Sequence, residues 1–300
     1  MFWAFTVIIS AMIMIAVFVT FVGVCLGSFV NALVWRTRQK ELIRNKAVGK
    51  KLTKTQQEQL KRLSIVSERS RCTHCDHELG AKDLVPVLSY LYLRGKCRYC
   101  GKKIEDTPIA ELFGGAVALA SYALWPLALD GVLAGVAFAA WLVLSALLLA
   151  LALYDARWQI LPDRLVAAAT VAAALFVILA SWTEGDASRL LDAFWGGLLI
   201  GGLFYLLHQI SGGRWIGGGD VKLGFALGVI AGSLSGAFLV IFGASLLGTL
   251  YAVGISIVTR QPLNGKVRIP FGPFLILAAV ITFLVGSELI EWYRNFLLGL

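Results

Sequence analysis

Charged residues are scarce in this sequence, and its first 35 residues contain no Asp, Glu, Lys or Arg. Only 15% of the 300 residues are charged, whereas 58% are hydrophobic, and the mean hydropathy is +0.79. These values exclude an ordinary soluble domain and are typical of a protein that crosses a membrane several times. Because basic residues are missing at the start, a cleavable signal peptide is also excluded, and residues 5–33 are expected to form a spanning helix.

The charges that are present gather in one stretch. Residues 36–107 hold 18 of the 27 Lys and Arg residues but only 8 of the 18 Asp and Glu residues. We therefore expect a first transmembrane helix (1–35), a basic insert (36–107) and a membrane domain (108–300). The predicted fold class is an all-α polytopic membrane protein with about eight transmembrane helices. The other seven spans are expected at 108–129, 132–154, 165–182, 191–210, 221–233, 237–258 and 270–292.

Basic residues also predict the orientation of the chain, because cytoplasmic loops carry an excess of Lys and Arg. The insert is therefore expected in the cytoplasm. Alternation of the spans then brings the loops 155–164, 211–220 and 259–269 to the same side, and both chain ends to the other. Each of these loops carries basic residues, namely Arg157, Arg164, Arg214, Arg260, Lys266 and Arg268.

Two aspartates lie at the edges of apolar segments on this predicted cytoplasmic side. Asp155 ends the run WLVLSALLLALALYD, and Asp220 lies in the turn RWIGGGDVKL. Two spans separate them, so they are expected at one face of the membrane, where they can meet. A carboxylate beside lipid is a functional candidate, although a single Asp at a helix end is more often solvated or a cap. Two carboxylates sharing one proton could activate water and polarise a carbonyl, as in aspartic proteases.

The residues next to these aspartates fit the same hypothesis. Gly217, Gly218 and Gly219 are expected to adopt positive φ and to let the backbone approach a substrate peptide. Pro162 is expected to fix the start of the next helix, and Asp163 to cap it. Two other classes stay open. A proton- or ion-coupled transporter would need a polar path across the bilayer, and a non-catalytic assembly scaffold would not need the aspartates.

Four of the five cysteines form two Cys-x-x-Cys pairs in the basic insert, at Cys72 and Cys75 and at Cys97 and Cys100. This spacing is typical of a tetrathiolate zinc site. Four protein ligands leave no open position for water, so the zinc is expected to be structural. Two disulfides are the alternative, which a reducing cytoplasm disfavours. Cys25, within the first span, is expected to be a small packing residue.

The first half of the insert is polar and basic. Thr53 and Gln56 predict a capping box that opens a short helix reaching about Val66. The basic face is expected to touch anionic lipid headgroups. No nucleic-acid partner is expected, because the insert lacks an aromatic and basic pattern for one.

Several motifs together resemble the type IV prepilin peptidases, a family of bifunctional leader peptidases and N-methyltransferases. Before the cysteines, the sequence GSFVN followed by Arg36 resembles the family's GSFLN…R segment, and the paired cysteines resemble its zinc-binding domain. Asp155 with the following Leu-Pro-Asp resembles its first catalytic motif. The remaining similar segments are PVLSY…LRGKC at 86–97, GGGDVKL at 217–223, which resembles the family's GxGDxKL, and IPFGPF at 269–274.

The resemblance implies that Asp155 and Asp220 form the catalytic dyad of a GxGD-type aspartic protease in the bacterial inner membrane, with Lys222 as a supporting residue. Its substrates would be prepilins or pseudopilins, cut at the cytoplasmic face after a glycine that ends a basic leader. The new N-terminus would then be methylated, with S-adenosylmethionine as the donor. A peptidase without methyltransferase activity and a presenilin-like intramembrane protease are the alternatives. The oligomeric state is not predicted.

The chain departs from the family pattern after the second cysteine pair. There the family reads close to SxRYPxVE, and this sequence reads EDTPIAE over residues 105–111. Pro108 and Glu111 align, but Asp106 and Thr107 stand where the family has Arg and Tyr. If this stretch supports methyl transfer, the N-methyltransferase activity would have to rely on Pro108 and Glu111 without the Arg and Tyr.

Overall fold

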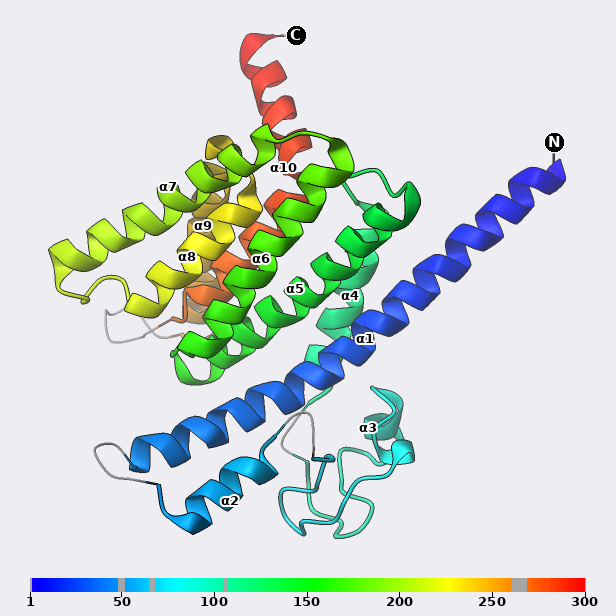
Figure 1. Ribbon diagram of the computed structural model, residues 1–300, viewed down its shortest axis with the longest axis vertical. Coiled ribbons are helices and arrows are strands. Elements are labelled where there is room, and N and C mark those ends of the chain that lie inside the picture. The colour runs from blue at the N-terminus through cyan, green and yellow to red at the C-terminus, as the bar shows by residue number, and fades with distance from the viewer. Residues whose placement is uncertain (1, 48–51, 65–67, 105–106, 261–268, 300) are drawn as a thin grey trace. The chain divides into compact units, whose positions relative to one another are not determined.

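The computed structural model describes residues 2–47, 52–64, 68–104, 107–260 and 269–299 (Figure 1). The chain forms two compact units, Met1–Leu119 and Ala120–Leu300. Val66, Asp106, Lys266 and Arg268 fall outside the described ranges. The described elements are α1 (Phe2–Lys46), α2 (Lys54–Arg62), η1 (Ala81–Asp83), α3 (Leu88–Tyr92), α4 (Ile109–Ala123), α5 (Gly131–Trp158), α6 (Asp163–Glu184), α7 (Ser188–Ser211), α8 (Gly218–Ala231), α9 (Leu234–Thr259) and α10 (Gly272–Leu298).

The prediction of an all-α polytopic membrane protein is confirmed. Six of the described helices are long and apolar enough to span a bilayer, namely α1, α5, α6, α7, α9 and α10. The expected spans at 108–129 and 221–233 correspond to the shorter helices α4 and α8. Helix α1 continues past the expected span to Lys46, because residues 36–46 are mainly good helix formers such as Arg, Lys, Gln, Glu and Leu.

Small residues let α1 and α4 pack closely within the first unit. A Cβ atom at Gly23 would lie 2.5 Å from the carbonyl oxygen of Gly114, and one at Gly27 would lie 2.2 Å from that of Ala110. Backbones that approach this closely tolerate no side chain between them, which is the usual basis of glycine-mediated packing in membranes. The glycine of the GSFVN segment is therefore required by a helix contact.

The capping box expected at Thr53 is present in both directions. The Thr53 side chain accepts a hydrogen bond from the Gln56 backbone N–H at 3.3 Å, and the Gln56 side chain accepts one from the Thr53 backbone N–H at 3.0 Å. The helix it opens ends at Arg62, earlier than expected. The Arg36 guanidinium binds the carbonyl of Ser64, which ties the chain beyond the helix to α1.

The second unit is a helical bundle around large aromatic side chains. Trp141 is fully buried, and its indole N–H donates to the Ser121 hydroxyl at 2.8 Å. The rings of Phe176 and Phe283 lie 5.3 and 4.0 Å from the Trp141 ring. Burying rings of this size contributes strongly to stability. This core holds α5, α6 and α10 together, and these helices carry or adjoin Asp155.

The short helix α8 packs against α7 through glycines. A Cβ atom at Gly228 would lie 2.2 Å from the carbonyl oxygen of Gly196, so the two backbones touch. Helix α8 begins directly after the turn that joins it to α7 (Figure 1). Its first turn therefore lies at the end of the second unit where α7 ends.

Candidate active site and metal centre

Asp155 lies in the last turn of α5 and is buried, with only 6% of its surface exposed. Its Oδ2 atom accepts a hydrogen bond of 3.1 Å from the backbone N–H of Gly272, the first residue of α10. A buried carboxylate needs such a donor to offset its lost hydration. Gly272 comes from the IPFGPF segment and was not among the expected site residues.

Asp220 lies in the first turn of α8, where a carboxylate also interacts favourably with the positive end of the helix dipole. It is half-buried, and its Oδ2 atom lies beside Gly217, the N-cap residue. Helix α6 leaves the end of the unit that holds Asp155, and α7 returns to it. Asp155 and Asp220 therefore lie at the same end of the second unit, where Leu161 of the loop after α5 touches Gly219, the neighbour of Asp220.

The expected positive φ at the three glycines before Asp220 is wrong. Gly217 has a φ of −72°, and Gly218 and Gly219 are already helical. Positive φ occurs earlier in the turn, at Gly212 and Gly213. The chain reverses direction directly after α7, and Gly212 and Gly213 adopt the left-handed conformation at this reversal.

The missing side chains of Gly218 and Gly219 instead allow close packing at the start of α8. A Cβ atom at Gly219 would lie 2.9 Å from the Cβ atom of Leu161, so only glycine allows the loop after α5 to touch α8. Next to Gly218 stands His208, whose Nδ1 lies 2.8 Å from the carbonyl oxygen of Ile216. His208 therefore ties α7 to the turn, and its role was not visible in the sequence.

Pro162 and Asp163 stand at the start of α6. Pro162 has the role expected of it, and Asp163 does not. Pro162 is the N-cap residue with a φ of −67°, which confirms that it fixes the start of the helix. Asp163 is the first helical residue rather than the cap. Its carboxylate instead accepts a hydrogen bond of 2.6 Å from Lys222 Nζ on α8. This ion pair joins the element that follows Asp155 to the element that carries Asp220.

Adding a methyl group at Gly272 tests whether its contact with Asp155 matters. A Cβ atom there would lie 2.7 Å from Asp155 Oδ2, so the carboxylate must move. If Asp155 is catalytic, we expect Gly272→Ala to lower kcat by about 10²-fold, the usual cost of an ångström-scale misplacement, with KM nearly unchanged. The matched control is Gly254→Ala on α9, whose added Cβ has nothing within 4 Å. Equal kcat for both variants would contradict a positioning role for Gly272.

Reversing the charges of the Asp163–Lys222 pair tests its function. Both side chains are well exposed, so the pair contributes little to stability. If Asp155 and Asp220 cleave a peptide, we expect Lys222→Asp alone to slow cleavage by about tenfold, because like charges then push the two elements apart. Asp163→Lys combined with Lys222→Asp should recover most of the rate. The measurement is the initial cleavage rate of each variant. No recovery in the double variant would show that the pair does not position α8.

The four cysteines of the two Cys-x-x-Cys pairs come together within the first unit. The sulfur atoms of Cys72, Cys75, Cys97 and Cys100 all lie within 4.8 Å of one another and could hold a metal ion. None of these cysteines forms a disulfide. Cys25 lies apart from this group, on α1. The donor set and the clustering fit a tetrathiolate site with no open position.

The two cysteine loops have the same backbone design. The N–H of Cys72 donates to the carbonyl of His77, and the N–H of Cys97 donates to that of Lys102, at 3.0 and 2.8 Å. A residue with positive φ follows each second cysteine, namely Asp76 at 55° and Gly101 at 69°. This turn directs both sulfur atoms of a pair toward one point, which explains why two short loops suffice for four ligands.

An ion pair braces these loops against η1. Asp83 accepts hydrogen bonds from Arg98 Nε at 2.6 Å and from the Tyr99 hydroxyl at 3.1 Å. The Arg98 guanidinium holds the pKa of the Asp83 carboxyl below its usual range. Arg98 and Tyr99 lie between the two ligands of the second pair, so this contact fixes that loop.

Two family models match the two halves of the chain. Residues 21–125 match the bacterial peptidase A24 N-terminal domain, and residues 142–253 match the type IV leader peptidase family. The chain is 31% identical over 290 residues to a prepilin leader peptidase/N-methyltransferase of Dichelobacter nodosus, covering 93% of this chain and 94% of that protein. The chain belongs to the type IV leader peptidase family. Both aspartates lie in the part of the chain that matches this family, and the four cysteines lie in the N-terminal match.

Two further relatives in the type IV leader peptidase family are similar. A prepilin leader peptidase/N-methyltransferase of Aeromonas hydrophila is 34% identical over 241 residues, with 78% of each chain covered. A type 4 prepilin-like proteins leader peptide-processing enzyme of Escherichia coli O78:H11 is 32% identical over 266 residues, covering 87% of this chain and 90% of that protein. No solved structure matches the chain. As a member of this family, the chain is a multi-pass membrane peptidase.

Proposed function

We propose that this chain is a membrane aspartic endopeptidase that removes the basic leader from type IV prepilins or pseudopilins, with Asp155 and Asp220 as its catalytic dyad. The observation that carries the proposal is that the segment after Asp155 meets the start of α8 beside Asp220, through the Leu161–Gly219 contact and the Asp163–Lys222 ion pair. Asp155 comes from the last turn of α5 and Asp220 from the first turn of α8. The printed names of the relatives supply the substrate class.

The mechanism follows from two carboxylates that share one site. Two like charges at close range favour the state with a single proton between them. The ionised carboxylate takes a proton from water, which attacks the scissile carbonyl, while the protonated carboxylate donates to the carbonyl oxygen. Gly272 fixes Asp155 through its N–H, and Asp220 lies beside Gly217 at the start of α8. Gly217 and Gly218 are exposed, so a substrate backbone can reach the dyad there.

We further propose that the dyad and the zinc site lie at the cytoplasmic face of the bacterial inner membrane. The segments next to Asp155 and Asp220 carry the basic residues Arg157, Arg164 and Arg214, and basic segments stay in the cytoplasm. The substrate helix would enter from the lipid, and its leader would meet the dyad where it leaves the membrane. Zinc bound by the four cysteines would be structural. Methylation of the new N-terminus, with S-adenosylmethionine as donor, is the second proposed activity.

Substrate variants test the proposed specificity. Purified wild-type protein in detergent is incubated with a peptide of basic leader, glycine and apolar helix, and with the same peptide carrying alanine in place of that glycine. We expect cleavage directly after the glycine and a rate at least about tenfold lower for the alanine peptide, because a Cβ at the cut would meet the backbone at the dyad. Equal cleavage of both peptides would favour presenilin-like proteolysis instead.

A further inference from the structure

The imidazole of His208, in the last turn of α7, is a polar group that the proposed mechanism does not use. His208 is half-buried, and its Nδ1 atom lies 2.8 Å from the carbonyl oxygen of Ile216. A carbonyl oxygen accepts hydrogen bonds and cannot donate them, so Nδ1 carries the proton and is the donor. The other ring nitrogen, Nε2, forms no hydrogen bond with any residue that the structure describes. The polar role of the ring therefore depends on Nδ1.

The turn that His208 binds is rich in glycine and leads directly to Asp220. Five of the eight residues from 212 to 219 are glycine. Glycine has more backbone freedom than any other residue, so a segment of this composition keeps one conformation only where other groups hold it. If Asp220 is catalytic, an ångström-scale shift of the turn would displace its carboxylate enough to slow the reaction strongly.

Hydrogen bonds near the end of α7 fix the first half of the turn. The Gly213 N–H donates to the His208 carbonyl at 2.9 Å, and the Trp215 N–H donates to the Ser211 hydroxyl at 3.3 Å. Apart from the His208 ring, no hydrogen bond from α7 to the described part of the turn reaches beyond Trp215. The second half of the turn, which starts at Ile216, is therefore hydrogen-bonded to α7 through the His208 side chain.

The glycines of the turn make room for the imidazole ring. A Cβ atom at Gly213 would lie 3.1 Å from His208 Cε1, and one at Gly218 would lie 3.8 Å from the same atom. A Cβ atom at Gly217 would lie 3.3 Å from Asp220 Oδ2. The ring and the carboxylate thus lie next to consecutive residues of the chain. A movement of these two glycines changes the surroundings of both groups.

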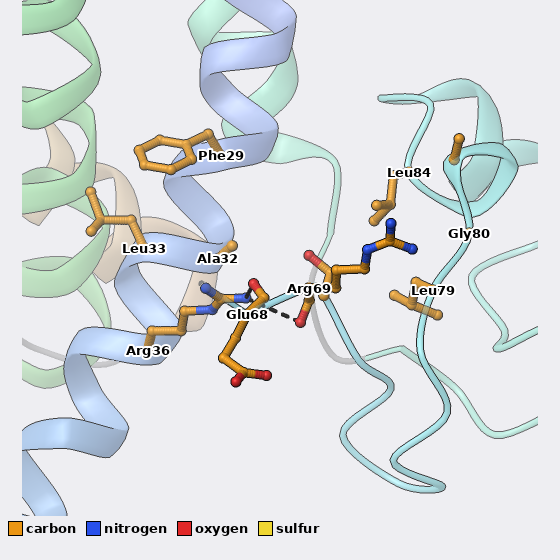
Figure 2. A pocket seen from close by; sticks show the side chains of 11 residues that line it. Phe29, Ala32, Leu33, Arg36, Glu68, Arg69, Leu79, Gly80 and Leu84 are labelled. Carbon is orange, nitrogen blue, oxygen red and sulfur yellow. Dashed lines mark hydrogen bonds between the residues drawn. The ribbon is translucent and has the colours of Figure 1, made fainter. Parts of the chain in front are cut away.

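The first unit contains a comparable contact after its GSFVN segment. Arg36 of α1 is only 8% exposed, and its guanidinium donates to the carbonyls of Glu68 and Arg69 at 3.0 and 3.3 Å. Figure 2 shows these bonds beside a cavity of about 430 Å³, where they join α1 to the segment that leads into the cysteine loops. In both units a side chain of a long helix holds a later segment by binding its backbone carbonyls.

We propose that His208 is a positioning residue for Asp220, and that its Nδ1–H fixes the glycine-rich turn by binding the Ile216 carbonyl. The inference rests on the proposed function, in which Asp220 belongs to the catalytic dyad. His208 is assigned no proton transfer, because its donor is committed to a backbone carbonyl. The hydrogen bond acts before substrate binds, by keeping Asp220 beside the loop after α5, where Leu161 touches the start of α8.

Three substitutions of His208 test this role through kcat and KM for cleavage of a prepilin-like peptide in detergent. His208→Leu removes the donor, and we expect kcat to fall by about 10²-fold with KM nearly unchanged. His208→Asn places an amide N–H where Nδ1 stands, and its kcat should recover to within about threefold of the wild type. His208→Gln places the amide one bond further out, where Nε2 stands, and its kcat should stay at least about tenfold below the wild type.

The matched control is Gln209→Leu on the same turn of α7. Gln209 is exposed, and its side chain donates to the Tyr205 hydroxyl of its own helix, so kcat should stay within about twofold of the wild type. Equal kcat for His208→Leu and wild type, or an equal loss in His208→Asn and His208→Leu, would overturn the assignment. If the thermal midpoint shows that His208→Leu is unfolded, the two amide variants decide, and equal kcat for both would overturn it.

Hydrogen exchange without substrate separates this inference from the proposed function. We expect the backbone N–H groups of residues 212–221 to exchange about tenfold faster in His208→Leu, and at the wild-type rate in His208→Asn. Unchanged exchange in a folded His208→Leu would contradict the proposed role of the Nδ1 hydrogen bond. If the wild type cleaves and His208→Leu cleaves equally well, only this inference fails. If the wild type does not cleave, the peptidase function fails, and faster exchange in His208→Leu still supports the contact that holds the turn.

Discussion

Replacing either Asp155 or Asp220 with Asn is expected to slow prepilin cleavage by about 10³-fold or more. Asparagine keeps the size of the side chain, and at position 155 it keeps an oxygen that can accept the Gly272 N–H. It cannot ionise, so it can neither take a proton from water nor share one with its partner. The measurement is the initial cleavage rate in detergent, together with the thermal midpoint.

The controls for this prediction come from the same unit. Asp130→Asn changes an exposed aspartate before α5 whose side chain makes no capping hydrogen bond, so its rate should stay within about twofold of the wild type. The double variant of Asp155 and Asp220 should be no slower than either single variant by more than about threefold, because residues that act as a unit are not additive. If the fold-loss in cleavage rate of the double variant equals the product of the two single losses, the two carboxylates act independently.

Removing one zinc ligand is expected to have the second largest effect. Cys97 is 5% exposed, and its backbone anchors the second loop. Structural zinc contributes about 10–16 kcal/mol in zinc-finger peptides, and a small polar fold with few apolar side chains depends on it. We expect Cys97→Ser to lose most bound zinc and most hydrogen-exchange protection over residues 68–104, measured by elemental analysis and mass spectrometry.

The fifth cysteine provides the matched control. Cys25 lies on α1, away from the cluster, so Cys25→Ser should keep both zinc and protection. Chelation of the wild type should reproduce the effect of Cys97→Ser. Full zinc content in Cys97→Ser, or unchanged protection after zinc is lost, would contradict a structural zinc site.

Features encoded in short stretches of sequence could be predicted. The apolar runs gave the helices, because a bilayer requires about 20 apolar residues per span. The spacing of Cys72 with Cys75 and of Cys97 with Cys100 gave the metal site. Counting the spans between Asp155 and Asp220 was enough to expect them at one end of a bundle.

Features that depend on tertiary contacts could not be predicted. The Gly272 N–H meets Asp155 across 117 residues, and nothing local to either residue reveals it. Glycine runs signal close packing or positive φ equally well, so the position of the left-handed turn at Gly212 was missed. Asp163 could equally have been a cap, and only the approach of Lys222 on α8 selects the ion pair.

Mapping the cut site of one substrate with two proteins tests the central claim most directly. Wild-type protein and Asp220→Asn are incubated in detergent with a prepilin-like peptide, without S-adenosylmethionine. Mass spectrometry of the products then identifies the cut site. The proposed dyad predicts a single cut after the glycine for the wild type and intact peptide for Asp220→Asn. Cleavage by a folded Asp220→Asn at a rate near that of the wild type would contradict the assignment of Asp155 and Asp220 as a catalytic pair.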